Sequence, residues 1–196
     1  MNNFSAGNFV RAQVGTDFEY KFFMPNLLPE IVDFDDPNIA VLLEEATQKL
    51  GELNAYSLLV PDIDFFIKMH EVKEATESSR IEGTKTNVDE IVVAKQDVAP
   101  EKRDDWQEVQ NYITALNFAI NRMEDLPLAT RLIKETHAVL LDGVRGKYKS
   151  PGSLRRTQNW IGGSTIRDAK FVPPTHTELD RYLSYFDHYL NDKALS

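Results

Sequence analysis

The stretch ATESSRIEGTKT, residues 75–86, places the carboxylate of Glu82 directly before Gly83, where a helix is expected to end. The C-terminal end of a helix carries partial negative charge, so an exposed acid there is disfavoured by about 0.3 to 1 kcal/mol. No local cation offsets this charge, because the positions three and four residues earlier are serines. Glu82 is therefore either a solvated side chain in a frayed last turn or the partner of a cation from elsewhere in the fold.

Helical spacing puts Ser78 on the same face as Glu82, one turn earlier. The Ser78 hydroxyl is therefore expected to steady the Glu82 side chain. Apolar periodicity predicts that the helix that carries both residues spans about 62–82, with Gly83 as its left-handed terminator.

Caps and apolar periodicity predict helices along most of the remaining chain. One begins at Pro37, with Asp36 as its cap and Gly51 as its stop. A short helix is expected after a capping box of Thr86 and Asp89.

Three longer amphipathic helices are predicted over about 100–123, over 127–141 and from about 177 onward. The residues before the first helix, with Pro25 and Pro29, are expected to form an irregular arm. Six helices predict an all-α fold of the helical-bundle type.

Residues 143–174 break this helical pattern. Five glycines and three prolines surround two short runs that suit β-strands, TQNWI and KFVPP, which predicts a long loop ending in a small β-hairpin. Residues 143–170 also carry a net charge of +6, which leaves −15 for the rest of a chain whose total is −9. This basic loop is either a solvated connection that offsets an acidic body or a binding surface.

Composition excludes several classes of protein. Because the chain has no cysteine, a disulfide framework, a Cys-ligated zinc site and a thiol nucleophile are excluded. No apolar run approaches the roughly 20 residues that span a bilayer, and the first residues lack a signal-peptide pattern. The pI near 5.0 argues against nucleic acid or an anionic membrane as a partner of the whole surface. A cytoplasmic protein is expected.

Several motifs together resemble the Fic family. SSRIEGT is similar to the inhibitory-helix signature of that family, a Ser or Thr, three residues, then Glu and Gly or Asn, which falls on Ser78, Glu82 and Gly83. LPEI, the spaced Ala46, Leu50, Gly51 and Leu53, HAVLLDGVRG, SPGSLRRTQNWIGG and FVPP follow in the order seen in bacterial Fic proteins with an N-terminal inhibitory helix. The resemblance covers roughly residues 24–190 and implies a Fic-like bundle with a hairpin flap.

The resemblance implies a protein adenylyltransferase, which moves AMP from ATP, with Mg²⁺, onto a hydroxyl of a target protein. In this family the signature loop reads His-x-Phe-x-(Asp/Glu)-Gly-Asn-(Gly/Lys)-Arg-x-x-Arg. Its His acts as the base, its acid holds the metal and its arginines neutralise developing charge. The inhibitory Glu pairs with the second Arg of this loop. By resemblance, Glu82 is thus an auto-inhibitory clamp, and that Arg is the cation it lacks locally.

The resemblance also assigns a role to this basic loop. The family flap, here about 143–174, aligns a target segment by strand addition over the active site. The residues expected to carry this docking are Asn159, Trp160, Ile161, Gly162 and Gly163. Trp160 could equally be a core anchor, since a tryptophan often serves as one.

The catalytic loop itself is missing from these 196 residues. None of the four histidines, His70, His137, His176 and His188, fits the signature. The nearest is His137, but the acid after it, Asp142, stands one place late and the Phe and Asn are absent, so His137 is assigned to the preceding helix. No catalytic residue and no metal ligand are therefore expected in this sequence, and ATP with Mg²⁺ is expected only in the complete enzyme.

The expected organisation is a Fic N-terminal region over 1–95 and the first part of the Fic core over 96–196, truncated before the catalytic loop. The chain is then either a fragment of a longer enzyme or a stand-alone protein that kept the regulatory half. Its expected partners are the target protein and further copies of itself.

Two other functions stay open. One is a non-enzymatic helical module that binds an acidic protein or a nucleic acid through the basic 145–170 loop. The other is inhibition in trans of a separate Fic domain, as in toxin–antitoxin pairs, although such inhibitors are normally smaller.

Overall fold

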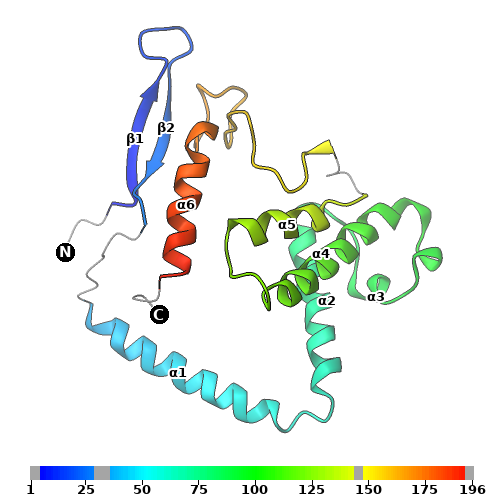
Figure 1. Ribbon diagram of the computed structural model, residues 1–196. Coiled ribbons are helices and arrows are strands. Elements are labelled where there is room, and N and C mark those ends of the chain that lie inside the picture. The colour runs from blue at the N-terminus through cyan, green and yellow to red at the C-terminus, as the bar shows by residue number, and fades with distance from the viewer. Residues whose placement is uncertain (1–4, 29–35, 144–147, 193–196) are drawn as a thin grey trace. The chain divides into compact units, whose positions relative to one another are not determined.

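The computed structural model describes residues 5–28, 36–143 and 148–192 (Figure 1). The chain divides into two compact units, one made of residues 1–31 and 115–196 and the other of residues 32–114. This boundary falls inside helix α4 (Arg103–Arg122). The predicted division at residue 95 is a boundary between two regions of the Fic family, not between compact units. The structure does not test this boundary, so it stays a prediction.

The unit of residues 32–114 begins with α1 (Pro37–Ser57), whose first turn is capped as predicted. The Asp36 carboxylate accepts from the backbone N–H of Asn38 at 2.9 Å. The predicted stop at Gly51 is wrong, because α1 continues through it to Ser57. A glycine inside a helix costs only about 1 kcal/mol relative to alanine, and good helix formers on both sides offset that.

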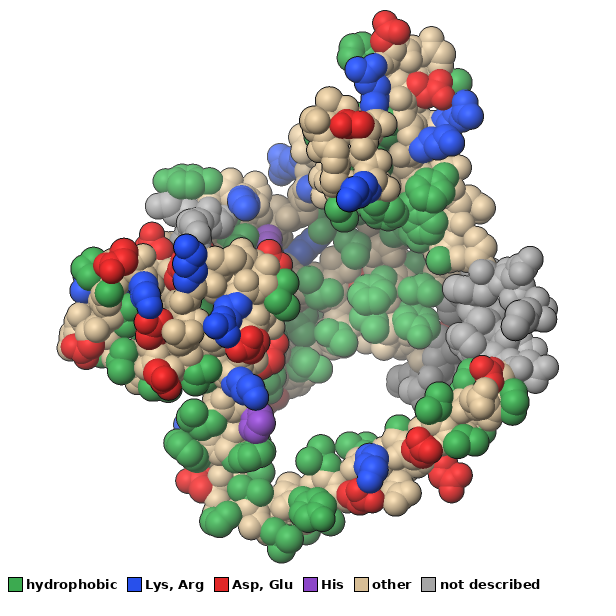
Figure 2. All heavy atoms as spheres, turned by 180° about the vertical axis from the view of Figure 1, so that it is seen from behind, with side chains coloured by type: hydrophobic (Ala, Val, Ile, Leu, Met, Phe, Trp, Pro, Cys, Tyr) green, Lys and Arg blue, Asp and Glu red, His purple; other side chains and the backbone are tan. Residues whose placement is uncertain are grey.

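Apolar side chains of α1 are exposed along its length, and none of its residues is buried (Figure 2). The most exposed of them on the periodic positions include Leu43, Leu50 and Leu53. The amphipathic pattern therefore correctly predicts a helix here. Among the described residues, however, the apolar face of this helix is not buried.

The second helix, α2 (Ile63–Ile81), matches the predicted range of 62–82. Its N-terminus is capped by Asp62, whose carboxylate accepts from the backbone N–H of Phe65 at 2.9 Å. The short helix that follows, α3 (Val88–Ile91), is capped by Asn87 and Glu90 instead of the predicted Thr86 and Asp89. The side chain of Thr86 is fully buried, and its hydroxyl makes no hydrogen bond to a described residue.

A small apolar core holds α2, α3 and α4 together. Ala75, Ile91 and Val109, one from each helix, are almost completely buried and in one cluster. Four half-buried side chains pack around this cluster: Val72, Trp106, Tyr112 and Ile113. The predicted stripe of the 100–123 helix thus contributes Val109 and two of its neighbours, Trp106 and Ile113. Two 3₁₀ turns, Lys95–Asp97 and Pro100–Lys102, connect α3 to α4.

The other unit contains an antiparallel hairpin that the sequence did not predict. Strands β1 (Gly7–Ala12) and β2 (Tyr20–Pro25) pair with Phe9 opposite Phe23. The expected irregular arm is therefore wrong for residues 7–25, and the all-α expectation is corrected to a mostly helical fold with a β-hairpin. Pro29 and the LPEI motif beyond Leu28 lie outside the described residues.

This unit also contains α5 (Thr130–Leu140) and α6 (Leu179–Leu190), with a 3₁₀ turn, His176–Glu178, before α6. Both helices confirm their predicted positions. Asp187 of α6 caps α5, because its carboxylate accepts from the backbone N–H and the hydroxyl of Thr130, each at 2.7 Å. None of the helices in the described ranges is both long and apolar enough to cross a membrane.

Candidate functional site

The last turn of α2 places Glu82 at the helix terminus that the sequence indicated. Glu82 is the C-cap residue, and Gly83 follows with φ of +102°. The backbone N–H of Gly83 donates to the carbonyl of Arg80 at 3.0 Å, and that of Thr84 donates to the carbonyl of Ser79 at 3.2 Å. These two bonds form a Schellman motif, which requires a left-handed residue after the cap. Gly83 therefore fixes where α2 ends and where the Glu82 side chain leaves it.

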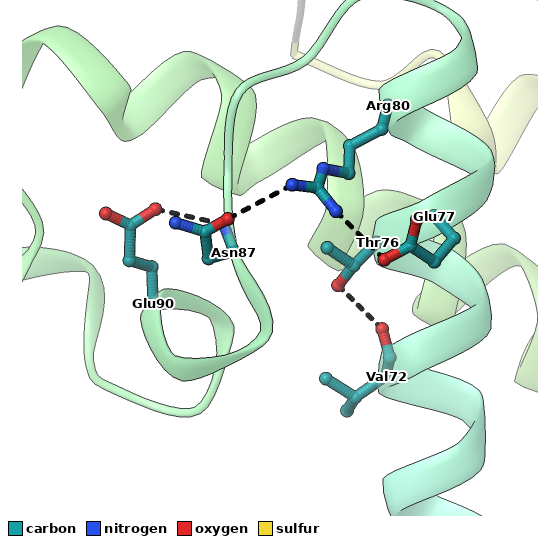
Figure 3. A network of polar contacts seen from close by, with 6 residues as sticks. All are labelled: Val72, Thr76, Glu77, Arg80, Asn87 and Glu90. Atoms are coloured by element: carbon teal, nitrogen blue, oxygen red, sulfur yellow. Dashed lines mark hydrogen bonds and ion pairs between the residues drawn. The ribbon is translucent and has the colours of Figure 1, made fainter.

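The Glu82 carboxylate is exposed and has no hydrogen bond or ion pair to any other described residue. The nearest basic residue in sequence, Arg80, is engaged elsewhere. Its guanidinium pairs with the Glu77 carboxylate at 3.0 Å and contacts the Asn87 side chain at 3.4 Å (Figure 3). Within the part of the chain that the structure describes, Arg80 is therefore not available to the Glu82 carboxylate.

Ser78 does not steady Glu82, so that expectation is wrong. Its hydroxyl donates to the Glu74 carboxylate, one turn earlier, at 2.8 Å. The hydroxyl of Tyr112 in α4 donates to the same carboxylate oxygen at 2.7 Å, and this bond raises the pKa of Tyr112. Glu74 thus joins α2 to α4. Neither Glu74 nor Tyr112 stood out in the sequence, because their contact spans 38 positions.

Buried side chains of α2 fix the rotation of the helix. Ala75, Thr76 and Ser79 are buried, and the Thr76 hydroxyl donates to the Val72 carbonyl at 2.7 Å (Figure 3). Ser79 and Ala75 lie three and seven positions before Glu82, on the same side of the helix, and Glu82 itself, at the C-terminal end of α2, is exposed. The core contacts therefore fix the direction in which the Glu82 side chain leaves the helix.

The connection after Gly83 is held by acidic side chains. The backbone N–H of Lys85 donates to the Asp105 carboxylate of α4 at 2.8 Å. Glu90 accepts from the backbone N–H of Asn87 at 3.0 Å and pairs with Lys102. The Lys102 ammonium, and then the Asn87 bond, lower the pKa of Glu90. These bonds keep the segment behind the terminator close to α4.

In the described residues, the predicted hairpin of the flap is a single β-bridge and not a pair of full strands. Ile161 and Phe171 make one antiparallel bridge, with hydrogen bonds of 2.8 Å from Ile161 and 3.2 Å from Phe171. Gly162 and Gly163 turn the chain with φ of +69° and +76°. A Cβ on Gly163 would lie 2.5 Å from the carbonyl oxygen of Asp168, so the turn requires glycine there.

Asp168 orders the tip of the flap. Its carboxylate accepts from the backbone N–H of Ser164 at 2.8 Å and of Thr165 at 2.6 Å, and from the Thr165 hydroxyl. The Thr165 hydroxyl bond, followed by the two backbone bonds, holds the pKa of Asp168 far below its usual range. The tip is therefore a preformed turn at neutral pH.

The predicted docking residues lie on the surface of this flap. Asn159, Trp160 and Ile161 are exposed, with 41% of the surface of Trp160 accessible. The alternative that Trp160 is a core anchor is therefore wrong. Because Ile161 turns its backbone groups toward Phe171, the backbone groups of Trp160 face the other edge. No described residue bonds to that edge at Trp160.

The base of the flap is held by two side chains, Arg155 and Gln158, that no sequence motif marks as supports. The guanidinium of Arg155 donates to the carbonyls of Thr157, at 2.9 Å, and Pro174, and burial lowers its pKa. The amide of Gln158 donates to the carbonyl of Pro173 at 3.0 Å. One of the basic residues in the 145–170 loop thus has a structural role. Arg145 and Lys147 lie outside the described residues.

His137 lies in α5, as predicted. Its Nδ1 accepts from the backbone N–H of Gly152 at 3.0 Å. This bond connects α5 to the start of the basic loop. Within the described ranges, no three His, Asp or Glu side chains gather in a way that could hold a metal ion.

The comparison with protein families matches one segment of the chain. The model for the Fic/DOC family N-terminal region matches residues 40–121. A search of curated proteins found no match. The matched segment runs from α1 through nearly all of α4 and includes Ser78, Glu82 and Gly83, while the flap lies outside it. The chain therefore carries the N-terminal region of the Fic/DOC family at residues 40–121, which confirms the family that its sequence resembles.

Proposed function

We propose that this chain is the regulatory and target-docking part of a protein adenylyltransferase that transfers AMP from ATP to a hydroxyl of a target protein. The observation that carries the proposal is the exposed carboxylate of Glu82 at the negative end of α2, which no described cation pairs. A carboxylate kept at an unfavourable helix position has a reason to be there if it binds a cation supplied from outside the described residues.

In this proposal Glu82 acts as an inhibitory clamp. It pairs with the second arginine of a Fic signature loop, which these 196 residues do not contain, and so withholds that arginine from the γ-phosphate of ATP. An arginine–carboxylate pair with two parallel hydrogen bonds is strong enough to hold such a state. The buried face of α2 at Ala75 and Ser79 supports this role, because it fixes the direction in which Glu82 leaves the helix.

The flap supplies target docking in the same proposal. An extended target segment adds as a strand along the edge at Trp160, and the preformed turn at Gly162 and Gly163 holds that edge open. ATP and Mg²⁺ bind at the signature loop and not at the described residues. A cytoplasmic location, where ATP is abundant, goes with the proposal.

Transfer of label from α-³²P-ATP tests the reaction. The full-length protein that contains these residues is incubated with Mg²⁺ and labelled ATP beside the 196-residue chain alone. We expect label on protein only where a signature loop is present, and calorimetry should show ATP binding by that sample alone. Tight ATP binding by the 196-residue chain would place a nucleotide site within it and contradict the proposal.

The alternative function, an interaction module that uses the basic loop, has one observation in its favour. Lys149, Arg156 and Lys170 are exposed basic residues on the described part of this loop. Such a module predicts binding to a polyanion that requires no ATP.

A further inference from the structure

The N-terminal hairpin lies against the second strand of the flap, although the two are about 150 residues apart in sequence (Figure 1). The backbone N–H of Phe23 in β2 donates to the carbonyl of Val172 at 2.8 Å. The neighbouring Phe171 instead bonds to Ile161 of the flap. Because successive residues of a strand turn their backbone groups to opposite sides, residues 171–172 lie between β2 and the first strand of the flap.

Aromatic side chains cross these strands in a row. The rings of Phe9 and Phe23 meet edge to face at a centroid distance of 5.4 Å, and those of Phe23 and Phe171 lie 6.0 Å apart. Aromatic pairs at such distances attract one another beyond the area that they bury. Phe22 and Val172, each next in sequence to a member of this row, are buried.

A second contact joins the tip of the flap to the loop of the hairpin. The guanidinium of Arg167 donates to the backbone carbonyl of Asp17 at 2.8 Å. Asp17 lies in the connection between β1 and β2, and Arg167 directly precedes Asp168, which orders the tip. The hairpin thus contacts the flap along a strand and also at its tip.

We infer that the N-terminal hairpin, residues 7–25, positions the flap for target binding, with Phe23 and Arg167 as positioning residues. This inference rests on the proposed docking function of the flap. Among the described residues, the flap has a single bridge, between Ile161 and Phe171, and an isolated two-stranded hairpin is marginally stable. An edge that receives a strand binds best when it is already ordered, because ordering it during association lowers the affinity. The hairpin supplies that order from the side opposite to the open edge.

Hydrogen exchange of the 196-residue chain tests whether the N-terminal hairpin orders the flap, and this measurement requires no catalytic activity. Arg167→Met removes the donor at nearly constant length, Arg167→Lys keeps a donor, and Arg156→Met changes an exposed arginine of the same loop. We expect the amides of Ile161 and Phe171 to exchange about two- to tenfold faster in Arg167→Met, as the loss of one hydrogen bond implies. Arg167→Lys should restore much of the protection, and Arg156→Met should leave exchange unchanged.

Phe23→Ala gives a second, stronger perturbation, because it breaks the aromatic row between the hairpin and the flap. Its effect should concentrate at Ile161 and Phe171, while the amides of the α2–α4 core keep their protection. Unchanged exchange at the flap in both Phe23→Ala and Arg167→Met would overturn the inference, and so would equal acceleration in Arg156→Met.

Auto-modification connects this support to target binding. In a full-length protein made active by Glu82→Gly, Arg167→Met should lower the maximal rate of labelling several-fold and leave the KM for ATP unchanged. Faster exchange at the flap with an unchanged labelling rate would overturn the positioning role. If Glu82→Gly itself yields no labelling, the proposed function fails instead, and the exchange measurement still decides whether the hairpin supports the flap.

Discussion

At the scale of single residues, Glu82 is the side chain whose position is hardest to explain by stability. It caps α2 at the negative end of the helix, is exposed, and has no ion pair within the described ranges. Three residues earlier on the turn, Ser79 is buried, so the helix cannot rotate to move Glu82 away. A residue that opposes local stability and that the core holds in place is typical of a functional site.

Glu82→Gln should therefore stabilise the 196-residue chain, by about 0.3 to 1 kcal/mol, because it removes a negative charge from the helix C-terminus. Urea unfolding measures this change. The matched control is Glu77→Gln in the same helix, which breaks the 3.0 Å pair with Arg80 and should leave stability equal or slightly lower. A loss of stability in Glu82→Gln would show that the carboxylate has a partner in this chain.

Asp168 gives the flap a dependence on pH. Its pKa is lowered in the folded chain, so its bonds stabilise the folded state fully above the ordinary value of 3.8, and that stabilisation is lost as the pH falls toward the lowered pKa. We expect Asp168→Asn to reduce stability by a constant amount above about pH 4 and by a shrinking amount below it. Urea unfolding of both proteins measures the difference. The measurements are made at intervals of about one pH unit from about pH 3 to 6, a range that includes the reference pKa. A difference that grows toward low pH would contradict this role.

At the scale of elements, two glycines show how position decides the effect of the same residue. Gly83 has a left-handed backbone that ends α2, whereas Gly51 lies inside α1. A Cβ at either position meets no atom within 4 Å, so only backbone preference distinguishes them.

Gly83→Ala should destabilise the chain by about 1 kcal/mol, since a left-handed conformation disfavours a Cβ. Gly51→Ala should stabilise α1 by up to about 1 kcal/mol, because alanine favours a helix interior. Thermal unfolding followed by circular dichroism compares the two. Equal effects of the two substitutions would mean that the terminator at Gly83 is not what ends α2.

Local signals predicted the helices well, because caps and apolar periodicity act over a few residues. Asp36, Asp62 and Gly83 do what their types suggest. The end at Gly51 was wrong because a single glycine is a weak stop when helix formers continue beyond it. The hairpin of residues 7–25 was missed because its strands are joined by seven residues, Gln13–Glu19, without a two-residue turn signal.

The sequence predicted those parts of the site that depend on local backbone structure. It did not predict the tertiary contacts that hold them in place. Glu82 at the helix end and the turn at Gly162 and Gly163 could be read from the sequence. The bond of Ser78 to Glu74, and the contact of Glu74 with Tyr112, depend on tertiary packing that no short-range pattern reveals. The same is true of the bond between Arg167 and Asp17.

At the scale of the whole molecule, charge distinguishes the proposed enzyme from a polyanion-binding module. The chain has a net charge of −9, whereas the 143–170 segment carries +6. The enzyme proposal predicts that retention on a nucleic-acid column is weak even at about 50 mM salt. Strong retention that requires no ATP, falls steeply between about 50 and 200 mM salt and is weakened by Arg156→Met and Lys170→Met would favour the interaction module over the enzyme.

The most direct measurement is the rate of label transfer from α-³²P-ATP by full-length protein carrying Glu82→Gly, compared with the unaltered protein and with Glu77→Gly. The clamp predicts that Glu82→Gly labels itself at least several-fold faster than the unaltered protein, because the arginine that Glu82 holds becomes available to ATP. Glu77→Gly, which perturbs the same helix without touching its terminal carboxylate, should label at the unaltered rate. Equal labelling by all three proteins would contradict the assignment of Glu82 as an inhibitory residue.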